Sequence, residues 1–375
     1  MTLHVAVVGA GAFGGWSALN LLRAGARVTL LDAWGAGNAR ASSGGETRII
    51  RGIYGGNARY VELTARAFEL WWEHEERWGR PLYHRTGALW MFQGDDGYAR
   101  STLPHLRRVG LEVAELSLAD AARRYPQIDF AGVTSVFFEI EAGYLLARQA
   151  CEAVRAAFVA EGGQYRGAAV RPGALSGGGL RELTLADGAA LRADRFVFAC
   201  GPWLGELFPE VIGDRITPTR QEVLFFGPPA GDARFDEGAC PVWVDYGARF
   251  LYGIPGNERR GFKVADDARG PRIDPTTEER VITPAAVARA REMLARRFPA
   301  LAGAPVVETR VCQYEQTPDG DFILDRHPAA DNVWLAGGGS GHGFKMGPAI
   351  GELVTRLVLG TAEPEAQFSL SRFGP

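Results

Sequence analysis

The stretch "LHVAVVGAGAFGGWSALNLLRAGARVTLLD" (residues 3–32) decides the fold. It opens with a short apolar run, continues into a G-x-G-x-x-G sequence at Gly9, Gly11 and Gly14, and then carries apolar residues at helical spacing. Gly25 ends the predicted helix, and a second apolar run ends at Asp32. A strand, a glycine-rich turn, a helix and a second strand in this order form the β-α-β fingerprint of a dinucleotide-binding fold.

Each residue of the fingerprint has an expected task. Gly9 permits the tight turn, Gly11 allows a pyrophosphate to approach the backbone, and Gly14 lets the helix pack on the strand. The helix N-terminus offers N–H donors to the phosphate, and Asp32 accepts a hydrogen bond from a ribose hydroxyl. FAD and NAD share this fingerprint, and a glycine-rich turn of another α/β fold is the structural alternative.

Length and composition exclude several classes of protein. The 375 residues suffice for two or three domains, and the formal net charge of -3 gives no electrostatic reason to expect nucleic acid or an anionic membrane as a partner. The four cysteines form no paired metal motif, so we expect no metal site and a reducing, cytoplasmic environment. Residues 5–22 carry no charge, but no basic segment precedes them and their glycines belong to the fingerprint; we expect neither a signal peptide nor a membrane span.

A second glycine-rich segment, "AGGGSGHGFKMGPAIG" (residues 336–351), follows a predicted buried strand at 332–338. An amphipathic helix comes next, and Pro348 suits its first turn. The loop therefore places a helix N-terminus, with its partial positive charge, beside Lys345. A reduced flavin carries negative charge along its N1–C2 carbonyl edge, which such an arrangement stabilises, whereas a nicotinamide gains no such anion. The segment favours a flavin; a helix-capping loop with a solvent-exposed lysine is the alternative.

Six motifs occur in the order typical of one known family. They are "VAVVGAGAFGG" with Asp32, "SSGGETRIIRGIYG" (42–55), "FVFACGPW" (196–203), "RFLYGIP" (249–255) with Lys263, "VCQYEQTPDGDFILD" (311–325) and "GGSGHGFK" (338–345). On these motifs the chain resembles, over nearly its whole length, the D-amino-acid oxidase superfamily of FAD-dependent amine oxidoreductases. It is nearest to the branch of monomeric sarcosine oxidase and N-methyltryptophan oxidase, for which the last two motifs are specific.

The resemblance implies a mixed α/β fold of two discontinuous domains, of the type found in glutathione reductase and p-hydroxybenzoate hydroxylase. The Rossmann-like FAD-binding domain would comprise residues 1–81, 144–220 and 318–375, and an inserted antiparallel-sheet substrate domain would comprise residues 82–143 and 221–317.

The sequence is compatible with that fold. Residues 151–170 predict a helix followed by a strand, which is typical of the second helix–strand unit of a nucleotide-binding domain. "VLFFGPP" (223–229) and "RFLYGIP" read as short strands bounded by turn residues, and "PGALSGGG" (172–179) reads as an exposed hairpin loop.

The resemblance also assigns the residues around the cofactor. FAD binding is expected at Gly9, Gly11, Gly14, Asp32, Ser43, Arg48, Val170, Gly201, Trp203, Cys312, Gly338, Gly341, Gly343, Phe344 and Lys345. Enzymes of this branch attach the flavin 8-methyl group covalently to the cysteine that matches Cys312, and Arg48 matches an arginine beside that bond, where a cation favours the reactive thiolate. The sequence departs from the family at Gly44, where those enzymes carry a histidine; this puts the efficiency of attachment in doubt. An inert, buried Cys312 is the alternative.

Further residues are assigned to the substrate. By resemblance, Arg51 and Lys345 clamp a substrate carboxylate, because a guanidinium offers a fork to a carboxylate and a second cation fixes its orientation. Tyr252 and Tyr314 match tyrosines that line the substrate face, although either also suits an aromatic core.

Two more positions bear on reactivity. Lys263 matches a lysine that activates oxygen in this branch, where a cation stabilises superoxide as it forms; a surface lysine is the alternative. Asp267 stands where sarcosine oxidases have an active-site histidine. An acid there changes which amine substituents are tolerated and can hold a second cationic group of the substrate, which argues against assuming that sarcosine itself is the substrate.

Together these assignments predict a monomeric FAD-dependent oxidase of secondary or N-substituted amino acids, which forms an imine and reduces O2 to hydrogen peroxide. Cyclic, D- and glycated amino acids stay open as substrates, as does a dehydrogenase that uses another acceptor. An RNA-modifying flavoprotein, a non-catalytic flavin scaffold and an NAD dehydrogenase are the other classes. The net charge opposes the first, the combination of Arg51, Lys263 and Lys345 opposes the second, and the colour of the purified protein decides the third.

Overall fold

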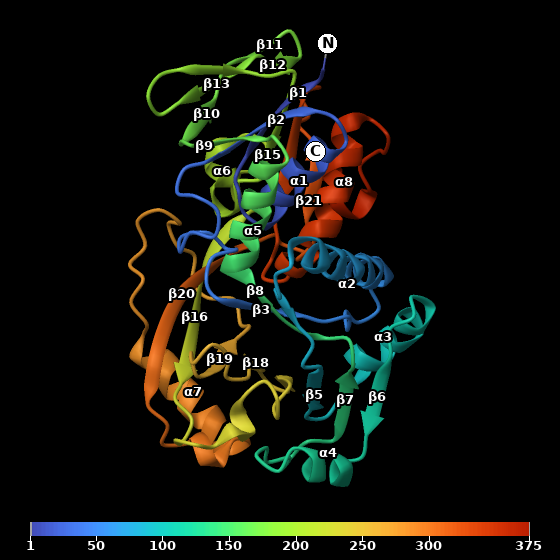
Figure 1. Cartoon of the computed structure of the whole chain (residues 1–375), viewed down its shortest axis with the longest axis vertical. Coiled ribbons are helices and arrows are strands. Elements are labelled where there is room, and N and C mark those ends of the chain that lie inside the picture. Colours follow the sequence, from blue (N-terminus) through green and yellow to red (C-terminus); the bar gives the residue numbers. More distant parts are fainter. Residues whose placement is uncertain (1, 375) are drawn as a thin grey trace.

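The computed structural model describes residues 2–374, and its first large element is a six-stranded sheet (Figure 1). The strand order is β21-β22-β15-β1-β2-β9, with β21 antiparallel to β22 and the other neighbours parallel. The strands are β1 (His4–Val8), β2 (Arg27–Asp32), β9 (Gln164–Gly167), β15 (Arg195–Phe198), β21 (Ile323–Arg326) and β22 (Val333–Gly337). The predicted β-α-β unit and the predicted strand at 332–338 are confirmed.

Two helices pack against this sheet, α1 (Ala12–Arg23) and α5 (Ala147–Ala160). Helix α8 (Gly347–Leu359) packs on α1, α2 (Ala58–Trp78) packs on α8, and the short α6 (Leu204–Leu207) follows β15. Helix α1 ends as predicted before Gly25, whose φ of 91° lies in the left-handed region. Pro348 stands in the first turn of α8, where its missing N–H costs no hydrogen bond.

A small antiparallel unit extends one end of the molecule (Figure 1). It consists of β10 (Val170–Pro172), β13 (Glu182–Leu185) and β14 (Ala190–Arg192), with the hairpin of β11 (Leu175–Ser176) and β12 (Gly179–Leu180). The hairpin confirms the loop predicted at 172–179. Its Leu175 is exposed, as expected for a turn at the surface.

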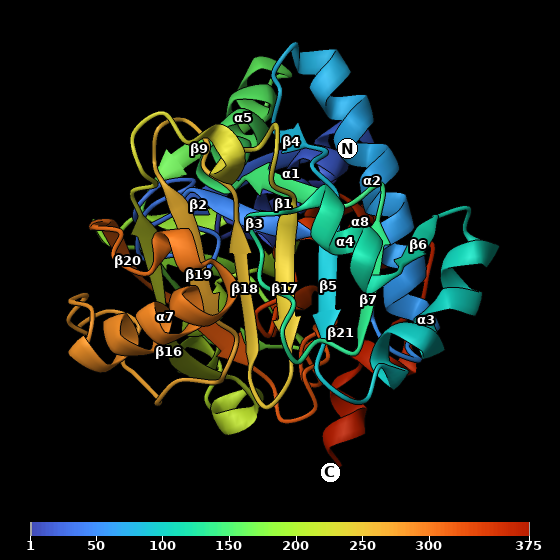
Figure 2. The same cartoon turned by 90° about the horizontal axis from the view of Figure 1, so that it is seen from below.

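The second large sheet has eight strands in the order β20-β16-β19-β18-β17-β5-β7-β6 (Figure 2). They are β5 (Ala88–Phe92), β6 (Val113–Leu116), β7 (Ser135–Glu139), β16 (Thr217–Phe226), β17 (Val242–Tyr246), β18 (Phe250–Ile254), β19 (Phe262–Asp266) and β20 (Val306–Gln316). The expected sheet was antiparallel throughout, but β17 pairs with β5 in parallel, so the sheet is mixed. The strand predicted at 223–229 is also longer than expected: β16 starts at Thr217, where it begins to pair with β20, and ends before Gly227.

The remaining helices flank this sheet. They are α3 (Gly97–Arg108), α4 (Leu118–Arg124) and α7 (Pro284–Arg297). The apolar face of α7, including Met293 and Leu294, packs with Phe226, Trp243 and Phe262 of the strands, so one face of the sheet is covered.

A three-stranded sheet lies between the two large sheets in Figure 1. Its strands are β3 (Thr47–Ile50), β4 (Tyr83–His84) and β8 (Gly143–Leu146), with β8 in the middle. Strand β3 carries Arg48, and Arg51 follows its last residue. The arginine predicted beside the flavin, Arg48, and the one predicted to bind the substrate, Arg51, therefore lie at the junction of the two halves.

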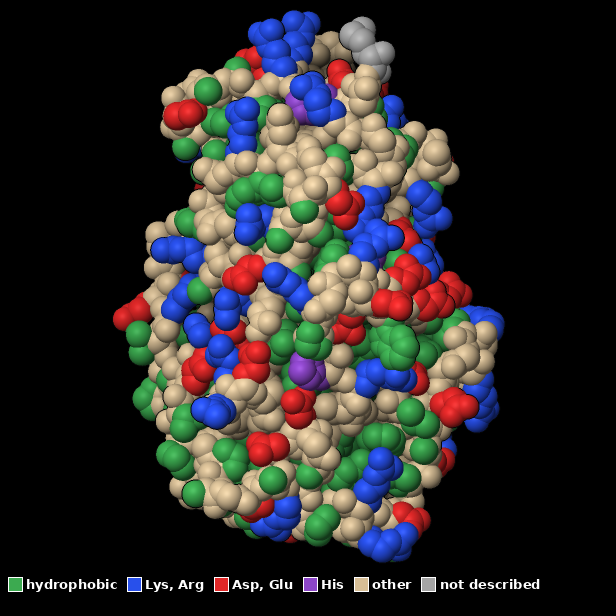
Figure 3. Space-filling model, in the orientation of Figure 1, with side chains coloured by type: hydrophobic (Ala, Val, Ile, Leu, Met, Phe, Trp, Pro, Cys, Tyr) green, Lys and Arg blue, Asp and Glu red, His purple; other side chains and the backbone are tan. Residues whose placement is uncertain are grey.

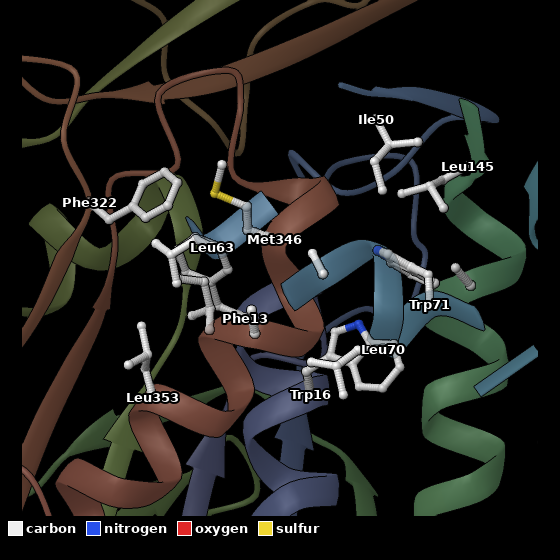
Figure 4. Close-up of a cluster of buried hydrophobic side chains, with 14 of the residues drawn as sticks. Phe13, Trp16, Ile50, Leu63, Leu70, Trp71, Leu145, Phe322, Met346 and Leu353 are labelled. Carbon is white, nitrogen blue, oxygen red and sulfur yellow. The ribbon is translucent and has the colours of Figure 1, made fainter. Parts of the chain in front are cut away.

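The largest core cluster lies behind the second glycine-rich loop, and Figure 4 shows its centre. Trp16 of α1 meets Trp71 of α2 edge to face at 5.3 Å, and Met346, the residue after Lys345, is fully buried in the same cluster. The indole N–H of Trp71 donates to the carbonyl oxygen of Lys345 at 2.8 Å. The core thus fixes the backbone from which the Lys345 side chain extends. Among residues 2–374, no helix combines the length and apolar character that crossing a bilayer requires.

Candidate active site

A cleft runs along the carboxyl ends of β1, β2, β9, β15 and β22. In an open α/β sheet this edge is where nucleotide ligands bind. The cleft continues past Arg48 to Tyr314 and Phe344, and so reaches from the first glycine-rich turn to the second glycine-rich loop.

The first glycine-rich turn requires its glycines. Gly9 has a φ of 102°, and a Cβ there would lie 2.2 Å from the carbonyl oxygen of Ala199. A Cβ at Gly14 would lie 1.9 Å from the carbonyl oxygen of Gly9, so the helix packs on the turn as predicted. Gly11 is the N-cap of α1 and has no side chain to cap the first turn. The N–H groups of that turn therefore face the cleft without a side-chain partner, which suits a phosphate.

Asp32 lines the cleft at the end of β2. One carboxylate oxygen accepts the backbone N–H of Ala10 at 2.8 Å, and the other accepts those of Trp34 and Gly35 at 2.9 and 2.8 Å. Asp32 thus ties together the two turns that shape this end of the cleft. A carboxylate has about four acceptor positions, so room is left for a ligand hydroxyl.

Most of the residues that the sequence predicted to bind the cofactor line this cleft. Those that do are Gly9, Gly11, Asp32, Ser43, Arg48, Val170, Gly201, Trp203, Gly341, Gly343 and Phe344. Gly14, Cys312, Gly338 and Lys345 do not line it and stand behind or beside its wall. Within residues 2–374, buried polar atoms without a protein partner include Ser42 Oγ and Glu315 Oε2 in two residues of the cleft wall. The uncapped helix, the glycines and these free atoms fit a dinucleotide cofactor.

Cys312 and Arg48 are brought together from β20 and β3. An Nη of Arg48 lies 3.4 Å from Cys312 Sγ, and the same guanidinium donates to the carbonyl oxygens of Ser42 and Gly44 at 2.6 and 2.5 Å. A Cβ at Gly44 would lie 2.2 Å from the carbonyl oxygen of Asn38. The loop as folded therefore has no room for the histidine that the resembling enzymes carry at this position.

Lys263 lies on β19 and is 3% exposed, which excludes a surface lysine. Its Nζ donates to the carbonyl oxygen of Thr47 at 2.9 Å and lies 3.3 Å from Thr47 Oγ1. Burial, reinforced by the positive charge of Arg48, lowers the pKa of Lys263 to about 7. The lysine charge is therefore poised to change near neutral pH.

Arg51 and Lys345 lie over the same tyrosine ring. The guanidinium carbon of Arg51 is 4.6 Å from the ring centroid of Tyr54, and Lys345 Nζ is 5.2 Å from it. Lys345 Nζ donates to the hydroxyl of Tyr54 and to the carbonyl oxygen of His342, both at 2.8 Å. Burial and the nearby Arg51 hold the pKa of Lys345 well below its ordinary value. Two cations so close together, with Lys345 buried and Arg51 half-buried, favour an anion as a ligand.

Asp267 and the two predicted tyrosines form a hydrogen-bonded row. The Tyr314 hydroxyl donates to Asp267 Oδ1 at 3.1 Å, and the hydroxyls of Tyr252 and Tyr314 are 3.4 Å apart. Burial raises the pKa of Asp267 to about 6, although Arg51 and Lys345 oppose that rise. The carboxyl group of Asp267 therefore lies close enough to Arg51 and Lys345 for both positive charges to act on it.

Sequence reasoning missed several residues of this region. Glu139 is buried behind Arg51, where it accepts the backbone N–H of Gly52 at 2.5 Å and the indole N–H of Trp90 at 2.6 Å. Nothing in the sequence around Glu139 marks it. Tyr54 lies inside the "SSGGETRIIRGIYG" motif, and its spacing of three from Arg51 was the available signal.

One compositional signal was also available. Lys263 and Lys345 are the only two lysines in a sequence that has 41 Lys and Arg residues. The charged surface in Figure 3 accordingly carries arginine among acidic side chains, and both lysines are buried. Guanidinium keeps its proton and is wider than ammonium, so these two lysines are the compact cations of the chain whose charge can titrate.

Comparison with known proteins agrees with this geometry. The model of the DAO family, described as FAD dependent oxidoreductase, matches residues 4–357. The monomeric sarcosine oxidase of Bacillus sp. (strain B-0618) is 30% identical over 378 residues, which cover 99% of this chain and 96% of the relative. The N-methyl-L-tryptophan oxidase of Salmonella heidelberg (strain SL476) is 27% identical over the full length of both chains.

A solved structure supports the same fold. L-proline dehydrogenase from P. horikoshii superposes with a TM-score of 0.86 at 20% identity, and the match covers 99% of this chain and 98% of that one. The family matched over residues 4–357 uses FAD, which fits the cleft, and the resemblance stated from the motifs is confirmed. This chain belongs to the DAO family of FAD-dependent oxidoreductases.

Proposed function

We propose that this enzyme oxidises the C–N bond of a secondary or N-substituted amino acid to an imine and passes the electrons to O2, forming hydrogen peroxide. The observation that carries the proposal is the placement of Arg51 and Lys345 over one tyrosine ring. The names of the relatives, a sarcosine oxidase and an N-methyltryptophan oxidase, point to the same class of substrate.

The two cations would hold the substrate carboxylate. The guanidinium of Arg51 offers a bidentate fork, and Lys345, which also contacts Tyr54, adds a point charge. A carboxylate between them relieves their mutual repulsion and raises the pKa of Lys345 toward its ordinary value. Bound FAD supplies the two-electron acceptor. Fixing the carboxylate fixes the Cα–H bond relative to that acceptor, which makes the transfer a positioned step.

Asp267 would then face the amine end of the substrate. Its carboxylate is oriented by Tyr314, and Tyr252 is the next hydroxyl of the row. An acid here suits a substrate with a protonated amine or a second cationic group. We therefore propose that sarcosine is not the preferred substrate of this chain.

Lys263 is the proposed site of oxygen activation. Its buried Nζ is fixed by Thr47, and a preorganised cation stabilises superoxide as it forms. The lowered pKa also favours a second candidate, a dehydrogenase with another electron acceptor, because above pH 7 a neutral Lys263 gives O2 little assistance.

We further propose that the flavin is attached covalently through Cys312, whose Sγ lies beside Arg48 at the cleft wall. In wild-type protein the flavin is expected to stay with the acid-precipitated polypeptide, and Cys312→Ser is expected to release it into the supernatant. Fluorescence of the two fractions measures this. Cys200→Ser, which alters a thiol that lines the cleft, serves as the matched control and should retain the flavin. Wild-type flavin that washes free under denaturing conditions would show Cys312 to be structural.

The domain division proposed from the resemblance has support from the sheets. The six-stranded sheet draws its strands from residues 1–81, 144–220 and 318–375, and the eight-stranded sheet draws most of its strands from 82–143 and 221–317. Strand β16 (Thr217–Phe226) crosses the proposed boundary at 220. We also propose a monomer, as the name of the Bacillus relative suggests, and a cytoplasmic location, for which the four free cysteines are the support.

A peroxide-coupled screen tests the proposed function. N-methyl, cyclic, D- and glycated amino acids are offered to the air-saturated enzyme, together with the amide of each. Peroxide is expected from at least one acid and from no amide, because the amides lack the charge that Arg51 and Lys345 hold. Turnover of the acids with a dye acceptor but without peroxide would select the dehydrogenase instead.

A further inference from the structure

The carboxyl group of Glu315 occupies a niche of glycines beside the cofactor cleft. Glu315 follows Tyr314 near the end of β20 and lines the cleft. A Cβ at Gly339 would lie 3.0 Å from Glu315 Oε1, and a Cβ at Gly337 or Gly201 would lie 3.5 or 3.6 Å from Oε2. A larger residue at 339 would press on the carboxyl group, so the glycines leave a space that this group fills.

The surroundings of Glu315 favour its uncharged form. The backbone N–H groups of Gly338 and Gly339 donate toward the carboxyl group, but within the described residues no lysine or arginine acts on it. The titratable neighbour at the adjoining end of β15 is the Cys200 thiol, whose pKa burial also raises. Isolated burial of a carboxylate is unfavourable, and it raises the pKa of Glu315 to about 7.

A neutral carboxyl group needs an acceptor for its proton. Glu315 Oε2 is buried and has no hydrogen-bond partner among residues 2–374, so the part of the chain that the structure describes supplies none. Leaving a buried polar group without a partner is costly. FAD, which the family uses, brings acceptors into the same cleft: phosphate oxygens, ribityl hydroxyls and flavin carbonyls.

We propose that Glu315 binds FAD as a neutral carboxylic acid and donates its proton in a hydrogen bond to an acceptor atom of the cofactor. The proton stays on Glu315, so no bond is broken. Ionisation removes the donor and leaves a buried negative charge facing a cofactor that carries two phosphates. FAD binding should therefore be strongest at low pH, and it should weaken as the pH rises above about 7.

The first test titrates the visible spectrum of the flavin in the holoenzyme, from about pH 6 to about pH 9. Wild type should show a spectral step at or above about pH 7, and Glu315→Gln, which keeps a neutral donor, should lose the step and resemble the low-pH wild type. Glu206→Gln is the matched control, because Glu206 is an exposed carboxylate of the same cleft; it should keep the step. Because Lys263 titrates in the same range, the comparison is repeated in a Lys263→Met background, where the step should remain with Glu315 and be lost with Glu315→Gln. A step that persists in the Lys263→Met, Glu315→Gln double variant overturns the proposal.

The second test measures FAD affinity directly, in a Cys312→Ser background that makes binding reversible. At about pH 6, Glu315→Ala should bind FAD about tenfold more weakly than the parent, the order of magnitude expected for one hydrogen bond to a buried group. Glu315→Gln should match the parent at low pH and exceed it at about pH 9. Equal affinity of the parent and Glu315→Ala across this range would mean that water, not the cofactor, takes the proton of Glu315. Neither test depends on which amine the enzyme oxidises.

Discussion

Replacing Lys263 by methionine is expected to slow reoxidation of the reduced enzyme by O2 by about 10²–10³-fold, the usual cost of losing one preorganised electrostatic group at a developing charge. Reduction of the flavin by substrate should change far less. Methionine has a similar length and tolerates the buried slot on β19, so the change removes the charge with little change in packing.

Stopped-flow absorbance separates the two half-reactions. Arg259→Met, which removes an exposed cation four residues away, is the matched control and should leave both rates unchanged. The oxidative rate of wild type should also depend on pH. Because the pKa of Lys263 is lowered to about 7, the ammonium is present below this pH and lost above it, so the rate should fall as the pH rises through 7. Equal slowing of both half-reactions in Lys263→Met would remove oxygen activation as its special role.

Arg51→Ala and Lys345→Ala are each expected to weaken the binding of carboxylate inhibitors by about 2–5 kcal/mol, because each leaves a desolvated carboxylate short of one partner. The two losses should not add, since both cations serve one carboxylate. Arg51→Ala also leaves the buried Glu139 without its nearby cation, so the thermal midpoint of each variant must be measured alongside.

Titration of the flavin spectrum with a carboxylate inhibitor gives the affinities of the wild type, the single variants and the double variant. Arg124→Ala, which removes an arginine stacked on Phe138 in the other half of the molecule, is the control for loss of a distant cation. Amide analogues should bind poorly to wild type and lose little more on mutation. Inhibitor binding that is unchanged in both single variants would mean that the substrate lacks an acid group.

The sequence predicted the parts of the fold that local chemistry determines. The turn at Gly9, Gly11 and Gly14 admits no Cβ at two of its three glycines, and this requirement is visible in the residue types themselves. The helix after Lys345 could be predicted equally well, because its apolar spacing and Pro348 lie within one short segment. For the same reason the motifs contain most of the residues of the cleft wall, whereas the lining residues within 33–41, 168–171 and 206–207 lie outside them.

The sequence did not reveal how strands that are distant in the chain pair with one another. The parallel contact of β17 with β5 joins Val242 to Ala88, and no turn between these distant segments specifies the direction of pairing. Glu139 and Glu315 owe their surroundings to segments far from them in the chain, so no local pattern marks them. The sequence itself shows that lysine is scarce. Only the folded chain shows that Lys263 and Lys345 are both buried, and it is their burial that gives the scarcity its meaning.

Anaerobic mixing of the purified holoenzyme with amino acids tests the central claim most directly. The flavin absorbance should bleach with an N-substituted or cyclic amino acid and should stay unchanged with its amide at the same concentration. The imine, or the carbonyl compound that its hydrolysis gives, should form in a one-to-one ratio with reduced flavin. A flavin that stays oxidised with every amino acid, but is reduced by an amine without an acid group or by NADH, would contradict both the carboxylate clamp and the proposed C–N oxidation of amino acids.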